Sequence, residues 1–288
     1  SVHLVTPNEA WVGGATRLAH TRDGGVTWDT IHLDDALPDT PDVRFVASQG
    51  RLNVYAVHFW NRGDGLMAIL AQQLGEGTVK AGMVLSTTDG GSSWDLATLR
   101  VAGSVSMWSR TDGWMTSGVA SGLYATTTNW RSSRRLLDGV VTSAYLAEDG
   151  RAWAVASPVP RVEPQTILHS EDSGETWNLS DIEGTAPAGG IGARVLAFAP
   201  DGVGWVGGGD SDGNGLIMTT HDGLSWTYEE TPVRSEVMAM QYVDGAVYAV
   251  ARDGMVVRRG PAPPRPGPVD SLKTKWGQLK RDRSSTKE

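Results

Sequence analysis

The sequence predicts an all-β fold, a β-propeller of six four-stranded antiparallel blades, or of seven as the alternative, followed by a C-terminal extension. A hairpin motif built on aspartate, glycine and tryptophan recurs along the chain, and an aromatic strand pattern recurs beside it. The composition agrees, with 36 glycines and 12 tryptophans against 3 phenylalanines. Many tight turns and one large residue at a fixed position are typical of repeats of about 40 to 45 residues, the length of a propeller blade.

The hairpin motif has the form Ser/Thr-x-Asp-x-Gly-x-Ser/Thr-Trp. An aspartate in such a turn accepts hydrogen bonds from its own backbone, and the tryptophan begins a half-buried strand. The segment Thr126–Trp130 keeps the tryptophan alone and is a decayed copy. The structural positions are Asp23, Gly25 and Trp28; Asp89, Gly91 and Trp94; Asp172, Gly174 and Trp177; and, in a copy one residue shorter, Asp222 and Trp226.

The second pattern is a polar turn followed by an apolar strand that carries an aromatic residue. A short strand-like run precedes each copy, for example Val43–Ala47 in the second repeat. Each repeat then reads as a four-stranded meander, which cannot bury both faces alone and is stabilised when blades pack radially. The aromatic positions are Trp11, Tyr55, Trp114, Trp153, Trp205 and Tyr248.

The hairpins resemble the Asp-box, or BNR, repeats of sialidase-like, sortilin-like and photosystem II assembly factor-like propellers. The resemblance is carried by four turns, each between the third and fourth strands of its repeat. It implies a structural role, in which the aspartate binds amides of its own hairpin and the tryptophan packs between blades. It also implies two functional alternatives on one scaffold: a non-catalytic component that binds proteins, and a glycan-binding protein or sialidase-like glycoside hydrolase.

Residues 1–260 form the predicted propeller, and residues 261–288 form a Pro-rich and then basic tail. Gly260–Pro266 holds too many prolines for a ladder strand, so the outer strand of the sixth repeat must come from elsewhere. Lys275–Leu279, residues upstream of Ser1, a seventh blade and a partner are the alternatives. The net charge is −8, and the six basic and three acidic residues of 269–288 leave −11 on the rest, which argues against a nucleic-acid ligand.

Several classes of site have no sequence support. The chain has no cysteine, no apolar run of membrane-spanning length and no intact signal peptide, so we expect no disulfide and no membrane span. Gly202–Gly207 matches a dinucleotide fingerprint but opens a strand, which indicates structure rather than nucleotide binding. The aromatic-Arg-Ile-Pro segment of sialidases is absent, so an enzyme is the less favoured interpretation, with no catalytic residue assigned and no cofactor expected.

One short segment copies the beginning of a calcium loop. Asp210, Asp212 and Asn214 place oxygen ligands on alternate residues. Position twelve of that frame is His221 instead of glutamate. A polar hairpin loop is therefore the favoured interpretation, with Ca²⁺ binding as the alternative.

Loop length supplies the candidate contact residues. We expect the loops between second and third strands to form the face opposite the Asp boxes, where propellers usually bind ligands. Trp60, Arg62 and Asp64 fall in a long insertion from His58 to Gly82, in which Leu66–Leu74 is expected to form two helical turns; Arg161 and Glu163 fall in another.

These loops and the tail 261–288 predict a protein partner. The favoured role is a structural or assembly component of a virion or another large complex, in an extracellular or virion-associated location.

Overall fold

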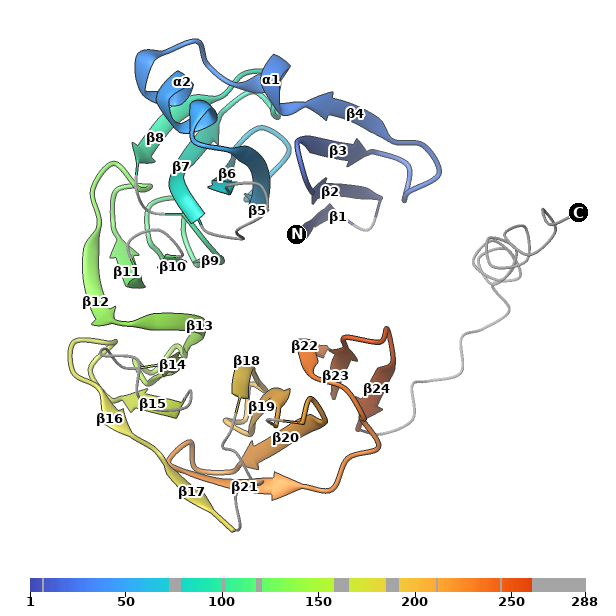
Figure 1. Ribbon diagram of the computed structural model, residues 1–288, viewed down its shortest axis with the longest axis vertical. Helices are drawn as coiled ribbons and strands as arrows, with labels where there is room; N and C mark the ends of the chain where they lie inside the picture. The colour runs from blue at the N-terminus through green and yellow to red at the C-terminus, as the bar shows by residue number, and fades with distance from the viewer. Residues whose placement is uncertain are drawn as a thin grey trace, which may run out of the picture.

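The computed structural model describes residues 1–6, 8–72, 79–99, 102–117, 121–157, 166–184, 192–210, 212–243 and 245–260. These residues form six sheets, antiparallel except for one parallel pair in the fifth, arranged as blades around an arc (Figure 1). The first three blades contain β1 (Val2–Thr6), β2 (Glu9–Gly13), β3 (Arg17–Thr21) and β4 (Asp29–His32); β5 (Arg51–Phe59), β6 (Gly65–Gln72), β7 (Val79–Thr87) and β8 (Asp95–Leu99); and β9 (Val105–Met107), β10 (Gly113–Ser117), β11 (Gly122–Thr126) and β12 (Arg134–Asp138).

Of the last three blades, the fourth has four strands, and the fifth and sixth depart from that number. The fifth gains a parallel strand, β17, on its outer edge, and the sixth has three strands among the described residues. Their elements are β13 (Val140–Leu146), β14 (Ala152–Ser157), β15 (Thr166–Ser170) and β16 (Asn178–Leu179); β17 (Asp181–Glu183), β18 (Gly192–Phe198), β19 (Gly204–Gly209), β20 (Gly215–Thr220) and β21 (Ser225–Glu229); and β22 (Val237–Val243), β23 (Ala246–Ala251) and β24 (Val256–Arg259).

Two helices, α1 (Leu33–Ala36) and α2 (Pro41–Ser48), connect the first blade to the second. The strand expected at Val43–Ala47 is therefore wrong, because Thr40 caps α2 through its side chain and Pro41 occupies the first turn, where proline favours a helix. Val43 and Val46 face the core from one side of the helix. No helix of the described residues is long and apolar enough to span a membrane.

The second blade corrects two further expectations. Tyr55 lies on β5, the first strand, and is half exposed, whereas the other five aromatic positions lie on second strands. The corresponding position on β6 is held by Leu66, which is fully buried in a cluster with Trp130. The segment expected to be helical, Leu66–Leu74, is strand β6 through Gln72, and its later residues lie outside the described residues.

The apolar core is divided among the junctions between neighbouring blades. Each junction from the first to the sixth blade has its own cluster of buried side chains, five in all among the described residues. Full burial of one large apolar side chain contributes roughly 1.5–3 kcal/mol. Closely packed strand pairs join each blade to the next, and within the described part none joins the sixth blade to the first. The blades therefore form an open arc, with β1 and β22 on opposite sides of the opening (Figure 1).

Candidate functional site

The four complete hairpins are held by repeated hydrogen bonds. In the first, the amide and the hydroxyl of Thr27 donate to the two carboxylate oxygens of Asp23, at 2.8 Å and 2.6 Å. Asp89 and Asp172 accept the same pair of bonds in their hairpins. These bonds hold the pKa of all three carboxyl groups at about 2. Asp222, in the shorter copy, accepts from the amides of Leu224 and Ser225 instead.

The hairpin tryptophans differ in burial along the arc. Trp226 is fully buried and Trp94 is 4% exposed, both at junctions with the preceding blade. Trp28, in the first blade, is 42% exposed because no preceding blade packs on it in the described structure. The hairpin aspartates thus hold their own turns, and the buried tryptophans pack at the junctions between blades.

The predicted contact residues of the second blade lie on the face opposite to the one expected. Trp60, Arg62 and Asp64 belong to the turn between the first and second strands, β5 and β6, and this turn meets the Asp89 hairpin. The amide of Gly90 donates to the carbonyl of Gly63 at 2.8 Å. In an antiparallel meander the first and third turns emerge at the same end of the sheet, so these residues share the Asp-box face. Arg161 and Glu163 lie outside the described residues.

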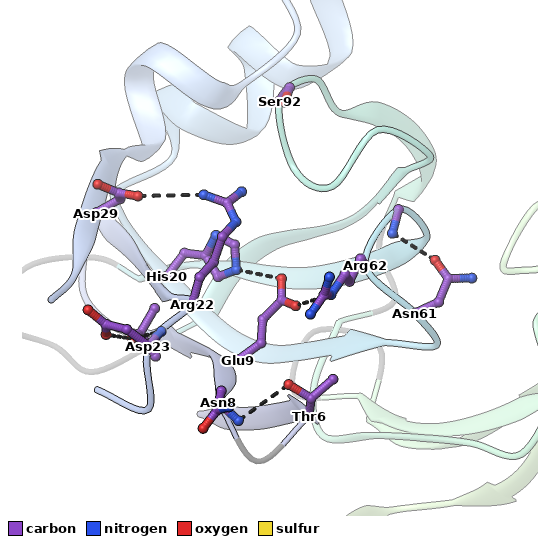
Figure 2. Close-up of polar contacts among 12 residues, drawn as sticks. Thr6, Asn8, Glu9, His20, Arg22, Asp23, Asp29, Asn61, Arg62 and Ser92 are labelled. Atoms are coloured by element: carbon purple, nitrogen blue, oxygen red, sulfur yellow. Dashed lines mark hydrogen bonds and ion pairs between the residues drawn. The ribbon is translucent and has the colours of Figure 1, made fainter. Parts of the chain in front are cut away.

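A buried carboxylate on this face was not identified from the sequence. Glu9 is 4% exposed, and Figure 2 shows it between His20 and Arg62. Its Oε1 lies 3.0 Å from His20 Nε2 and its Oε2 lies 2.9 Å from Arg62 Nε. His20 stacks on Trp11 at 3.9 Å between ring centroids, and burial lowers its pKa, so at neutral pH the neutral ring donates to Glu9.

This arrangement fixes the Arg62 side chain on the surface. The Arg62 side chain is 78% exposed, although its Nε is bound by a buried carboxylate. A guanidinium has five N–H donors in a rigid fork, so the outer donors can bind a ligand while Nε stays anchored. Arg62 lines a pocket of about 360 Å³ together with Glu9, Arg22, Asp89 and Gly90. A glutamate two residues before Trp11, at the start of the same strand, is the sequence signal that could have suggested the cluster.

A larger groove of about 710 Å³ adjoins the same turn, between the second and third blades. Trp60 lines it and donates from Nε1 to the carbonyl of Ser109 at 2.8 Å. Asp64 pairs with Arg110 at 2.5 Å, and Arg131 lies on the far wall. We call the exposed arginines of the two pockets the arginine rim: Arg22, Arg62, Arg110 and Arg131.

The centre of the arc is chemically different. A pocket of about 350 Å³ there is lined mainly by small, polar uncharged and apolar residues, such as Gly103, Ser104 and Val141. Among the described residues Arg194 is the one charged member of its lining, and it pairs with Glu236 at 3.1 Å. A glycosidase needs two carboxyl groups facing one bond, and this lining, as far as it is described, contains none.

The calcium-like segment forms a tight turn. Asp210 accepts from the backbone amides of Asp212 and Asn214, and Asn214 Nδ2 donates to its second carboxylate oxygen at 2.9 Å. An asparagine amide that donates to a carboxylate does not offer its oxygen in the same direction. Within the described ranges, no group of three or more histidines or carboxylates could hold a metal ion. Calcium binding stays a prediction.

Comparison with known proteins places this architecture among characterised propellers. No protein-family model matches the chain. Photosystem II assembly lipoprotein Ycf48 of Synechococcus sp. (strain CC9902) is 30% identical over 234 residues, 78% of this chain. The Ycf48 proteins of Prochlorococcus marinus (strain SARG) and Synechococcus sp. (strain CC9605) are 25% and 29% identical over 81% and 77% of this chain. The chain spans 59%, 73% and 71% of the lengths of these relatives, respectively.

Solved structures agree on the fold. Ycf48 bound to a D1 peptide aligns with a TM-score of 0.59 and 18% identity, covering 90% of this chain and 77% of that one. A GH74 enzyme of Niastella koreensis aligns with a TM-score of 0.60 and 11% identity, covering 90% of this chain and 44% of that one. The chain therefore has a β-propeller fold, and in sequence it is similar to the photosystem II assembly lipoproteins Ycf48.

Proposed function

We propose that this protein is a non-catalytic scaffold that binds a segment of a partner protein during assembly of a large complex. The three curated relatives are photosystem II assembly proteins, and a propeller of similar fold has been solved with a D1 peptide bound. Photosystem II is accordingly the complex that we propose, with D1 as the partner. The virion component and the glycan-binding protein considered from the sequence gain no support from these relatives.

The arginine rim is the observation that carries the binding site. Arg22, Arg62 and Arg110 have side chains that are 66%, 78% and 64% exposed. They line pockets of about 360 Å³ and 710 Å³ that meet at the turn carrying Trp60, so an aromatic surface lies beside the guanidinium groups. Arginine pairs bidentately with carboxylates, and arginine and tryptophan are enriched where proteins bind most tightly.

The chemistry of the rim defines the partner segment. The segment should be extended, because two neighbouring pockets can be filled by successive residues of an extended peptide but not by one compact side chain. It should carry at least one carboxylate, from an acidic residue or a chain end, to pair with the guanidinium donors. The carboxylates beneath the rim, Glu9 and Asp64, hold two of these arginines in place and limit the entropy lost when the peptide binds.

The test is a binding titration of the full chain with overlapping synthetic peptides that cover D1. We expect one segment to bind, and Arg131→Gln and Arg62→Gln each to weaken it by about tenfold or more, because a hydrogen bond to a charged group contributes about 1.5–3 kcal/mol. Arg44→Gln is the matched control, since Arg44 is an exposed arginine on α2 that pairs with Asp39 and lines neither pocket.

Each unfavourable result rejects a different part of the proposal. Absence of any binding D1 segment rejects photosystem II as the complex. Binding that all three variants leave unchanged rejects the rim as the site. A thermal unfolding scan of each variant confirms that the loss of affinity is not a loss of fold.

A further inference from the structure

A recurring tryptophan contact joins neighbouring blades, and the described residues of the junction between the fifth and sixth blades lack it. The tryptophan of each intact hairpin from the second blade onward packs near the second strand of the blade before it. Trp177 lies 6.1 Å from Trp114 between ring centroids, and Trp153 donates from Nε1 to Gly223, in the Trp226 hairpin, at 2.6 Å. Each of these tryptophans directly precedes the fourth strand of its own blade or is the second residue of it.

Trp205, on the second strand of the fifth blade, has no such partner in the described structure. The sheet of the sixth blade ends at β24, so neither a fourth strand nor a hairpin tryptophan follows within the described residues. The Nε1 atom of Trp205 is buried and has no hydrogen-bond acceptor there, in contrast to the equivalent atom of Trp153. The fifth and sixth blades are therefore joined without the contact that completes the other junctions.

A pocket of about 460 Å³ lies where that contact would be. Its inner wall is apolar, with Trp205, Ile217 and Ala249 each 9% exposed or less. Its rim carries Glu229 and Glu230 beside β24. On β24 itself Val256 is 61% exposed, as expected for an edge strand that no further strand covers.

We propose that residues Lys275–Leu279 of this chain bind here as the fourth strand of the sixth blade, with the Trp276 side chain in the pocket beside Trp205. The order of residues fits, because Trp276 is followed by Gly-Gln-Leu and would lie at the start of the strand as the other hairpin tryptophans do. Strand addition of this kind gains its affinity from main-chain hydrogen bonds and its specificity from a pocket for a side chain.

Length and charge agree with this occupant. Fifteen residues separate Gly260 from Trp276, which reach up to about 50 Å when extended and readily return to the end of β24 where a hairpin would lie. The prolines of this stretch exclude it from the ladder but not from a connection. Lys273, Lys275 and Lys280 flank the tryptophan, and Glu230 stands on the rim of the pocket, whereas Glu229 already pairs with Arg259.

The experiment compares the full chain with Trp276→Ala and with Lys287→Ala, a tail substitution outside the segment. Amide hydrogen exchange is followed by mass spectrometry on peptides that cover residues 252–260. We expect exchange of the β24 amides to be at least about tenfold faster in Trp276→Ala than in the other two chains, with the remaining blades unchanged. Trp276→Phe, which keeps an aromatic ring, should restore most of the protection.

Two outcomes would overturn the proposal. Equal exchange in all chains means that the edge of β24 is open or is covered by another occupant, such as residues upstream of Ser1 or a partner. Protection that rises with protein concentration means that the tail binds a second copy and not its own chain. Neither outcome bears on the arginine rim, which lies on the first three blades.

Discussion

Alanine substitutions at the glycines of the Asp-box hairpins can distinguish two contributions to stability, that of the contact between blades and that of the backbone geometry of the turn. Gly25 and Gly91 occupy the same place in their hairpins, with φ of +87° and +80°. A Cβ at Gly91 would lie 2.7 Å from Cη2 of Trp11 in the preceding blade, whereas at Gly25 the nearest atom is Cζ2 of Trp28, at 3.6 Å. Of these two hairpins, only the second has a neighbour to collide with.

The two substitutions to alanine should therefore differ. The left-handed backbone costs an alanine about 1–2 kcal/mol at either position. Overpacking against Trp11 adds about 1–3 kcal/mol at Gly91 alone. We expect Gly25→Ala to lower the free energy of unfolding by about 1–2 kcal/mol and Gly91→Ala by about 2–5 kcal/mol. Gly14, with no atom near its Cβ position and no positive φ, is the control, and Gly14→Ala should be neutral or stabilising by up to about 1 kcal/mol.

Urea unfolding followed by tryptophan fluorescence measures these differences, with a shared slope m confirming that the same surface is exposed in each variant. Each kcal/mol corresponds to a shift of about 2–4 °C in the melting temperature for a domain of roughly this size. Equal destabilisation by Gly25→Ala and Gly91→Ala would refute the reasoning, because it would mean that the clash between the blades adds nothing to the loss of unfolding free energy.

Three further predictions concern burial and pH. Trp226→Ala, at a fully buried site, should cost about 3–5 kcal/mol, and Trp28→Ala about 1 kcal/mol or less, measured by urea unfolding. Hydrogen bonds within the hairpin hold the pKa of Asp172 at about 2. The contribution of Asp172 to the stability of the fold is therefore complete above about pH 4 and is lost as the pH falls towards 2. In Asp172→Asn the melting temperature should depend less on pH in that window. Burial, with the charge of His3, lowers the pKa of His58 to about 4, so stability should fall between about pH 6.5 and 4 as the unfolded chain gains the proton first; His58→Phe should remove this dependence, and an unchanged profile would contradict it.

The repeat architecture could be predicted because its signals are local. Each Asp-box hairpin carries its own hydrogen-bond partners within a few residues, so Asp89 and its neighbours indicate the turn without knowledge of the rest of the fold. The second blade was harder, because the long apolar run at Leu66–Leu74 has no periodicity that separates strand from buried helix. The helix cap at Thr40–Pro41 is a local signal for α2, but the apolar residues after it also fit the strand pattern of the repeats, which led to the wrong prediction.

The site was less accessible than the fold. Trp60, Arg62 and Asp64 were selected by their place in a long insertion, but the face on which they lie depends on which strands that insertion contains. Glu9 and Arg62 are separated by more than one blade of sequence and meet only when the first two blades pack together. Pairings of this kind depend on tertiary geometry, which cannot be read from residue types and their spacing along the sequence.

The open arc has a consequence for how the molecule loses its structure. In a closed ring every blade has two neighbours, whereas in the part of the chain that the structure describes the first and sixth blades each pack closely on one, so their stability there rests on a single junction. For units coupled only to nearest neighbours, disorder begins at the ends and moves inward. Opening should therefore start at either terminus of the arc, while the fourth and fifth blades, also joined by the main-chain pairing of β17 with β21, should unravel last.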